Sequence, residues 1–79
     1  NSVFNYSIKI ADFYYKDSAK NMSDRIINET NIKNPIIKTI SNTKYRVLLG
    51  PFNDIKKLEE SFNDIKSLNF ENIEILKDV

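Results

Sequence analysis

Apolar and polar residues alternate in two similar stretches of the chain, YSIKIADF at residues 6–13 and YRVLL at residues 45–49. Alternation with a period of two is typical of a strand that buries one of its two faces. The residues predicted to face the core are Tyr6, Ile8, Ile10, Tyr45, Val47 and Leu49. The residues predicted to face solvent are Ser7, Lys9, Ala11, Lys44, Arg46 and Leu48.

Two other stretches carry apolar residues at helical spacing. Asp17 is predicted to cap a helix that runs to residues 28–30, and Asn53 is predicted to cap a second helix. The apolar stripes are Ala19, Met22, Ile26 and Ile27 in the first helix and Ile55, Leu58, Phe62, Ile65 and Leu68 in the second. Residues 36–40 and 73–76 are predicted to be short strands. The predicted order is therefore strand, helix, strand, strand, helix, strand.

The two halves of the chain repeat this plan. A shift of 39 positions aligns Tyr6 with Tyr45 and Phe13 with Phe52, and it aligns the core positions of the two helices as well. A repeated strand-helix-strand unit of this length predicts an α+β fold of the βαββαβ, ferredoxin-like (RNP-like) type. In this fold a four-stranded antiparallel sheet has the first and third strands in its centre and both helices on one face. We expect one domain over residues 1–79, with its core in residues 6–76.

Composition excludes several kinds of chemistry. The 79 residues contain no Cys and no His, which excludes thiol and imidazole catalysis and the usual zinc sites, and we expect no cofactor. The single glycine excludes a glycine-rich phosphate loop. The net charge of +1 argues against a nucleic-acid partner. The chain contains no run of 18 apolar residues, so we expect no membrane span in it. We expect a domain without enzymatic activity, cut from a longer protein because the chain opens at Asn1 without Met.

The solvent-facing side of the predicted sheet carries three cations, Lys9, Lys44 and Arg46. Lysines on such a face can serve solubility alone. Arg46 is more informative, because the chain has only one other arginine and because a guanidinium offers a planar fork suited to carboxylates and to pairs of sugar hydroxyls. Gly50, which follows the third predicted strand, is expected to be structural, since a Cβ would not fit where the chain turns into the helix.

The stretch YRVLLGPF, followed by a capped amphipathic helix, resembles the second half of a SPOR domain. That family's pattern runs Tyr-Arg-Val-x-Val-Gly-Pro-Phe and continues into an apolar helix. YSIKIADF with Ala19 is similar to the first half, in which the usual run is Val-Gln-x-Gly-Ser-Phe. Here Lys9 replaces the Gln, Ala11 the Gly and Asp12 the Ser, so the contacts of the first strand depart from the family pattern. The resemblance covers residues 6–76.

This resemblance implies a module that binds bacterial peptidoglycan, specifically glycan strands that have lost their stem peptides, at the division septum. It places the parent protein in the periplasm or cell envelope, for example as an amidase or a lytic transglycosylase of the rare lipoprotein A type. The implied glycan-binding face is the helix-free face of the sheet. Arg46 matches the family's arginine directly, and Lys44 stands where some members have an aromatic ring, which Tyr14 or Tyr15 would have to replace. The expected glycan-binding residues are Ser7, Lys9, Ala11, Tyr14, Lys44, Arg46 and Leu48.

The chemistry of the implied ligand agrees with a cationic face. Removal of the stem peptides leaves a free lactyl carboxylate on each muramic acid, so the stripped strand is a regular polyanion. Two other classes remain open as alternatives. An RNA-binding module of the same topology needs aromatic rings on the open face, and the predicted positions hold none. A regulatory or dimerising ferredoxin-like domain needs an apolar open face or a ligand loop. We expect a monomer that binds glycan and no nucleic acid.

Overall fold

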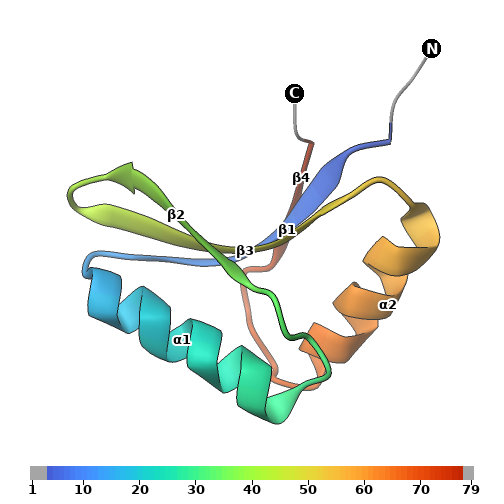
Figure 1. Ribbon diagram of the computed structural model, residues 1–79, viewed down its shortest axis with the longest axis horizontal. Coiled ribbons are helices and arrows are strands. Elements are labelled where there is room, and N and C mark those ends of the chain that lie inside the picture. The colour runs from blue at the N-terminus through green and yellow to red at the C-terminus, as the bar shows by residue number, and fades with distance from the viewer. Residues whose placement is uncertain (1–3, 78–79) are drawn as a thin grey trace.

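The computed structural model describes residues 4–77 and contains six elements (Figure 1). They are β1 (Tyr6–Phe13), α1 (Lys16–Glu29), β2 (Ile36–Ser41), β3 (Lys44–Phe52), α2 (Ile55–Lys66) and β4 (Glu74–Lys77). The predicted order of elements is confirmed. The predicted limits differ by at most three residues, and the largest difference is at the end of β3, which continues through Phe52.

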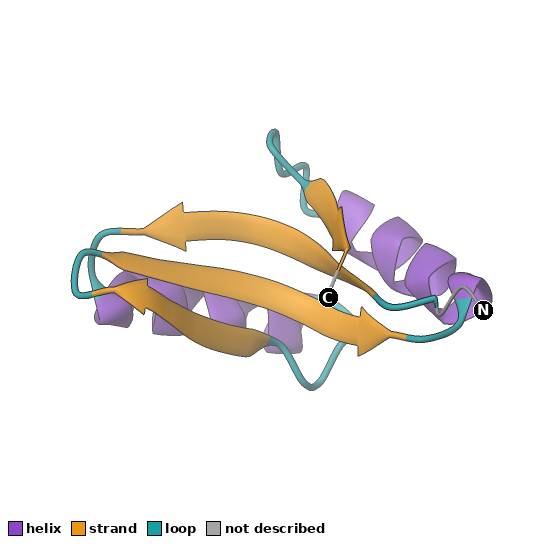
Figure 2. Ribbon diagram, turned by 90° about the horizontal axis from the view of Figure 1, so that it is seen from above, coloured by secondary structure: helices purple, strands orange, loops and turns teal. Residues whose placement is uncertain are grey.

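All four strands form one antiparallel sheet in the order β2-β3-β1-β4. The two central strands are therefore β1 and β3, as the repeat predicts. Both helices lie on the same side of the sheet (Figure 1). Helix α1 lies below the β2–β3 hairpin, and α2 lies below the opposite end of the sheet. Seen from above, the strands lie in front of the helices and their upper face is uncovered (Figure 2). We call this uncovered side the open face. The predicted ferredoxin-like fold is confirmed.

The core lies between the helices and the two central strands. Its buried side chains come from the predicted apolar positions of β1, β3 and both helices, and they are Ile8, Ile10, Ala19, Ile26, Val47, Leu49, Leu58 and Ile65. Ile32, in the connector before β2, is also buried, although its polar neighbours predict an exposed loop. Ile55 is 59% exposed at the first turn of α2, so its predicted place in the apolar stripe is wrong.

Both helix caps lie one or two residues from their predicted positions. Residue 15 precedes α1 as its N-cap without a side-chain hydrogen bond, and Asp17 lies inside the first turn. A carboxylate there still interacts favourably with the positive end of the helix dipole. Asp54, not Asn53, caps α2, and its Oδ1 accepts a hydrogen bond of 2.8 Å from the backbone N–H of Lys56.

The pairing of β1 with β3 is irregular at the middle of β1. Lys9 lies opposite Leu48 and Ala11 lies opposite Val47, so one extra residue of β1, Ile10, is inserted between these pairs. A bulge of this kind reverses the alternation of the residues that follow it. Ala11 therefore packs beside the core, and its predicted place on the open face is wrong. Asp12 takes the open-face position instead, directly opposite Arg46.

A second irregularity lies in β3 at Gly50 and Pro51, which are joined by a cis peptide bond. Phe52 pairs with Tyr6 and Leu49 pairs with Ile8, so β3 has one residue more than β1 over this interval. Gly50 has a φ of +114°, a value that residues with a Cβ rarely adopt. Gly50 thus forms a bulge within β3 rather than the predicted end of the strand.

Candidate functional site

Residues that lie directly opposite each other in an antiparallel sheet share a face, so the register defines the rows of the open face. One row crosses all four strands and consists of Glu74, Lys9, Leu48 and Ile36. The next row consists of Asp12, Arg46 and Lys38. Lys44 lies on the same face beside the β2–β3 turn, opposite Ser41. These rows hold four cations and two carboxylates around a short apolar strip.

Arg46 and Asp12 form a two-pronged ion pair at the centre of this face. The Arg46 Nε donates to Asp12 Oδ1 at 2.8 Å, and Nη2 donates to Oδ2 at 3.1 Å. Both side chains are 22% exposed, so the pair is half-shielded from water. The hydrogen bond from Arg46 lowers the pKa of Asp12 below its usual value, and the positive charges of Arg46 and Lys9 act in the same direction. Asp12 is therefore a carboxylate at neutral pH.

Lys9 joins this pair to the neighbouring strand. Its Nζ lies 3.4 Å from Asp12 Oδ2 and 3.5 Å from Oε1 of Glu74 on β4. The side chain of Lys9 is 18% exposed, whereas that of Glu74 is 57% exposed. Two carboxylates thus surround Lys9, and its charge is largely compensated on the β4 side of the face.

The uncompensated positive charge of the open face lies toward β2 and the β2–β3 turn. Lys38 and Lys44 are both exposed, and neither forms an ion pair within residues 4–77. Lys38 lies directly opposite Arg46, and Lys44 lies two residues before it in β3. An exposed ammonium pair of this kind attracts anions without fixing their orientation.

An apolar strip lies next to these charges. Leu48 is half-buried between Lys9 on β1 and Ile36 on β2, and Ile36 is 43% exposed. Side chains of this kind suit the C–H faces of sugar rings, while the flanking charged groups suit their hydroxyl, amide and carboxylate oxygens. The arrangement can therefore bind an extended ligand that presents both kinds of surface.

Two predicted site residues do not reach the surface of the open face. Ser7 is only 4% exposed, because it lies in central strand β1, opposite Leu76 of β4 and beside the Gly50–Pro51 bulge of β3. Ala11 is turned toward the core by the bulge at Ile10. Lys9, Lys44, Arg46 and Leu48 do lie on the open face, and their role in binding stays a prediction.

Tyr14 and Tyr15 form an exposed aromatic corner between β1 and α1. They are 61% and 67% exposed, and their rings meet edge to face with centroids 4.8 Å apart. The corner lies at the same end of the sheet as the β2–β3 turn, because Phe13 pairs with Tyr45. The rings are thus available to a ligand that extends beyond Lys44, and they remain a predicted contact.

A cavity of about 320 Å³ continues the open face past the edge of β1. Strand β4 pairs only with residues 6–9 of β1, so the chain before β4 leaves a groove beside the rest of the strand. Lys9 and Asp12 form one wall of this groove, and Phe70 and Asn72 form the other. A ligand bound at the ion pair has room to extend into it.

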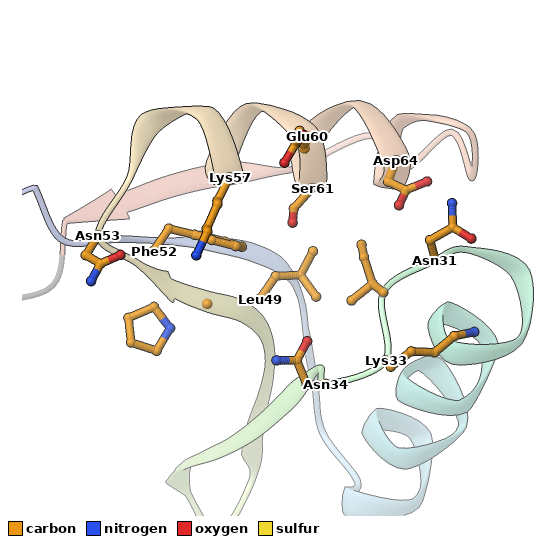
Figure 3. A pocket seen from close by; sticks show the side chains of 13 residues that line it. Asn31, Lys33, Asn34, Leu49, Phe52, Asn53, Lys57, Glu60, Ser61 and Asp64 are labelled. Carbon is orange, nitrogen blue, oxygen red and sulfur yellow. The ribbon is translucent and has the colours of Figure 1, made fainter.

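A larger cavity, of about 650 Å³, lies on the helix side of the sheet. Figure 3 shows it between α2, the end of β3 and the segment before β2, with Lys57, Ser61 and Asp64 on one side and Asn31 and Asn34 on the other. Its rim mixes both signs of charge. Lys33, also at this rim, donates its Nζ to backbone oxygens of Ile27 and Thr30, so it holds the end of α1. The mixed lining favours no single class of ligand.

No helix within residues 4–77 is long and apolar enough to cross a membrane. No group of three or more acidic side chains in that range is arranged to hold a metal ion.

Comparison with protein families matches residues 2–75 to the SPOR domain. This match covers nearly the whole chain, and the chain therefore belongs to the SPOR domain family, whose members are peptidoglycan-binding modules without catalytic activity found in bacterial cell-envelope proteins. Comparisons with curated proteins and with solved structures found no match.

Sequence reasoning missed three charged residues of the face, Asp12, Lys38 and Glu74. Strict alternation assigns Asp12 to the core side, and the partners of the two edge strands depend on a register that the sequence does not define. A signal for Asp12 was nevertheless present. Ile10 and Phe13 are both apolar and three residues apart, and a regular strand cannot point both toward the core.

Proposed function

We propose that this domain binds peptidoglycan through the open face of its sheet and prefers glycan strands that lack stem peptides. The observation that carries the proposal is the position of Arg46 on the central strand β3 of the uncovered face, opposite Lys38 and two residues after Lys44. The sequence resemblance also matches Arg46 to the arginine of the family pattern. A glycan strand that lies across β1, β3 and β2 would meet these groups together with the apolar strip of Leu48 and Ile36.

The preference for stripped strands follows from the charge of the face. Lys38 is exposed on β2 directly opposite Arg46, and Lys44 is exposed two residues before Arg46 in β3. A strand without stem peptides carries a carboxylate on each muramic acid, whereas an intact strand carries an uncharged amide at the same place. Since an exposed ion pair contributes up to about 1 kcal/mol, several such contacts along a regular polyanion produce a measurable preference.

Such a ligand preference would localise the parent protein. Strands without stem peptides arise where amidases act, at the division septum of the cell envelope. A small domain that binds them without cleaving them would bring an attached enzyme, such as an amidase or a lytic transglycosylase, to this place. In this proposal the domain acts as a monomer in the periplasm, because one open face is sufficient for the contact.

The proposal is tested by retention of the purified domain on peptidoglycan sacculi. We expect retention on untreated sacculi and stronger retention after an amidase has removed the stem peptides. The variant Arg46→Ala should weaken binding to the treated sacculi by roughly thirtyfold, equivalent to about 2 kcal/mol, since a guanidinium that donates several hydrogen bonds is lost.

Lys20→Ala provides the control, because Lys20 is exposed on α1, on the other side of the sheet, and the variant also removes one positive charge. It should bind as the unmodified domain does. Equal retention on treated and untreated sacculi would contradict the preference for stripped strands, and no retention on either would contradict the function.

A further inference from the structure

We propose that Asp12 is a specificity residue of the open face. Its carboxylate accepts hydrogen bonds from Nε and Nη2 of Arg46, so that the remaining N–H groups of this arginine bind uncharged oxygens of the glycan. The inference rests on the proposed glycan-binding function and goes beyond it, because it assigns the uncharged and the anionic groups of the glycan to different residues of the open face. Arg46 would contact hydroxyl and N-acetyl oxygens, and the lactyl carboxylates would contact Lys38 and Lys44.

The geometry of the ion pair supports the first part. A guanidinium binds a carboxylate best through two parallel N–H groups. Asp12 already uses the edge formed by Nε and Nη2 of Arg46, at 2.8 and 3.1 Å. The N–H groups of Nη1 and the second N–H of Nη2 are not bound by Asp12. They belong to a guanidinium whose orientation Asp12 fixes and whose charge it compensates.

The charges around the pair strengthen this effect. Lys9 lies 3.4 Å from Asp12 and 3.5 Å from Glu74, so its charge is also compensated on the face. A ligand carboxylate placed at Arg46 would meet the negative charge of Asp12 at short range, and Glu74 on β4 adds a more distant negative charge. Such repulsion is a means by which a site rejects one ligand group while accepting another. An uncharged carbonyl or hydroxyl oxygen is not repelled in this way, and it accepts hydrogen bonds from the remaining N–H groups of Arg46.

The distribution of the other cations supports the second part. Lys38 lies beside Arg46 on the side away from Asp12, and Lys44 lies farther toward the β2–β3 turn. Within residues 4–77 neither has a carboxylate partner. An anionic group of the ligand is therefore attracted to this side of the face.

The test compares two ligands of equal length that share a glycan backbone. One is a stem-peptide-free peptidoglycan oligosaccharide, which carries lactyl carboxylates, and the other is a chitin oligosaccharide, which carries the same N-acetyl groups but no carboxylate. The variant Asp12→Asn keeps the shape of the side chain and removes its charge. It should bind the anionic ligand about three- to tenfold more tightly, with a steeper dependence on salt, and the chitin oligosaccharide about threefold more weakly.

These opposite changes have one physical origin. In Asp12→Asn the guanidinium keeps its charge uncompensated, which favours an anion, but it loses one of the two hydrogen bonds that orient it for an uncharged oxygen, because the amide nitrogen of Asn is a donor. The double variant Asp12→Asn/Arg46→Ala should lose the gain for the anionic ligand. Asp24→Asn is the matched control, because it makes the same change of net charge on the exposed surface of α1 and should alter neither affinity.

Three results would overturn the role of Asp12. The affinities of Asp12→Asn could change in the same direction for both ligands, which indicates a structural role only. They could remain unchanged for both. The unmodified domain could bind the anionic ligand but not the chitin oligosaccharide, which means that Arg46 does not serve uncharged oxygens. If the unmodified domain binds neither ligand, the glycan-binding function itself fails, and this inference fails with it.

Discussion

Gly50 shows at the scale of a single residue why one position of this chain has no substitute. Its φ of +114° lies in a region that side chains with a Cβ disfavour. A Cβ at this position would also lie 3.0 Å from Cδ2 of Phe52 and 3.1 Å from its backbone nitrogen. The ring is the end of a flexible side chain, whereas the backbone nitrogen moves only if the bulge itself shifts. Backbone conformation and close contact thus both require glycine here.

We expect Gly50→Ala to destabilise the domain by about 1–3 kcal/mol, because the methyl group strains this backbone conformation. For a domain of this size, that corresponds to a fall in melting temperature of at least about 5 °C. Thermal unfolding followed by circular dichroism measures it. Asn69→Gly is the control, since Asn69 has a φ of 56° and glycine accepts this value easily. A Gly50→Ala variant that melts within a degree of the unmodified domain would show that the bulge can relax.

At the scale of the strand, a bulge occurs at nearly the same place in both halves of the repeat. The extra residue of β1 is Ile10, and the extra residue of β3 lies at Gly50–Pro51, which the shift of 39 positions aligns with residues 11 and 12, one or two positions farther along. In each half the bulge lets two apolar residues three positions apart face the core, Ile10 with Phe13 and Leu49 with Phe52. The repeat thus conserves a break in alternation as well as the alternation itself.

This bulge marks the limit of what alternation could predict for the site. In β1, Lys9 precedes the bulge, and in β3, Arg46 and Leu48 precede the bulge at Gly50–Pro51. The predicted face of these three residues agrees with the register. Ala11 and Asp12 follow the break in β1, and their faces are exchanged. The fold was predictable because the core residues of strands and helices recur at regular spacing. The pairing of Asp12 with Arg46 was not, because it depends on one inserted residue.

We expect Ala11→Asp to destabilise the domain by about 1–3 kcal/mol, because the bulge turns this half-buried side chain toward the core, where a carboxylate loses part of its hydration. Ile36→Asp is the matched control, since it places the same side chain in a strand of the same sheet at a position that is 43% exposed. The variant at Ala11 should melt at least about 5 °C below the variant at Ile36. Equal melting temperatures would contradict the placement of Ala11 beside the core.

At the scale of the whole molecule, the sheet separates two surfaces that differ in charge and shape. The open face carries an ordered sequence of charges, with Glu74 and Asp12 toward β4 and with Lys38 and Lys44 toward β2 and the β2–β3 turn. The helix side carries the larger cavity, whose rim mixes Lys57, Asp64 and asparagine side chains (Figure 3). Size alone favours the second surface as a ligand site, and the arrangement of charge favours the first.

The two surfaces are distinguished by mapping the bound glycan on the whole domain. In a titration of the ¹⁵N-labelled domain with a stem-peptide-free oligosaccharide, we expect backbone amide shifts in β3 and in the central part of β1, and smaller shifts in β2 at the edge of the sheet. Amides of α2 should not shift, because the sheet and core separate them from the open face. Since the structure holds Arg46 by its contact with Asp12, the side-chain Nε–H of Arg46 should give a resolved signal that moves on binding. Shifts concentrated in residues 31–34 and 57–64 would instead place the glycan in the cavity beside α2, and the role proposed for Arg46 would then be wrong.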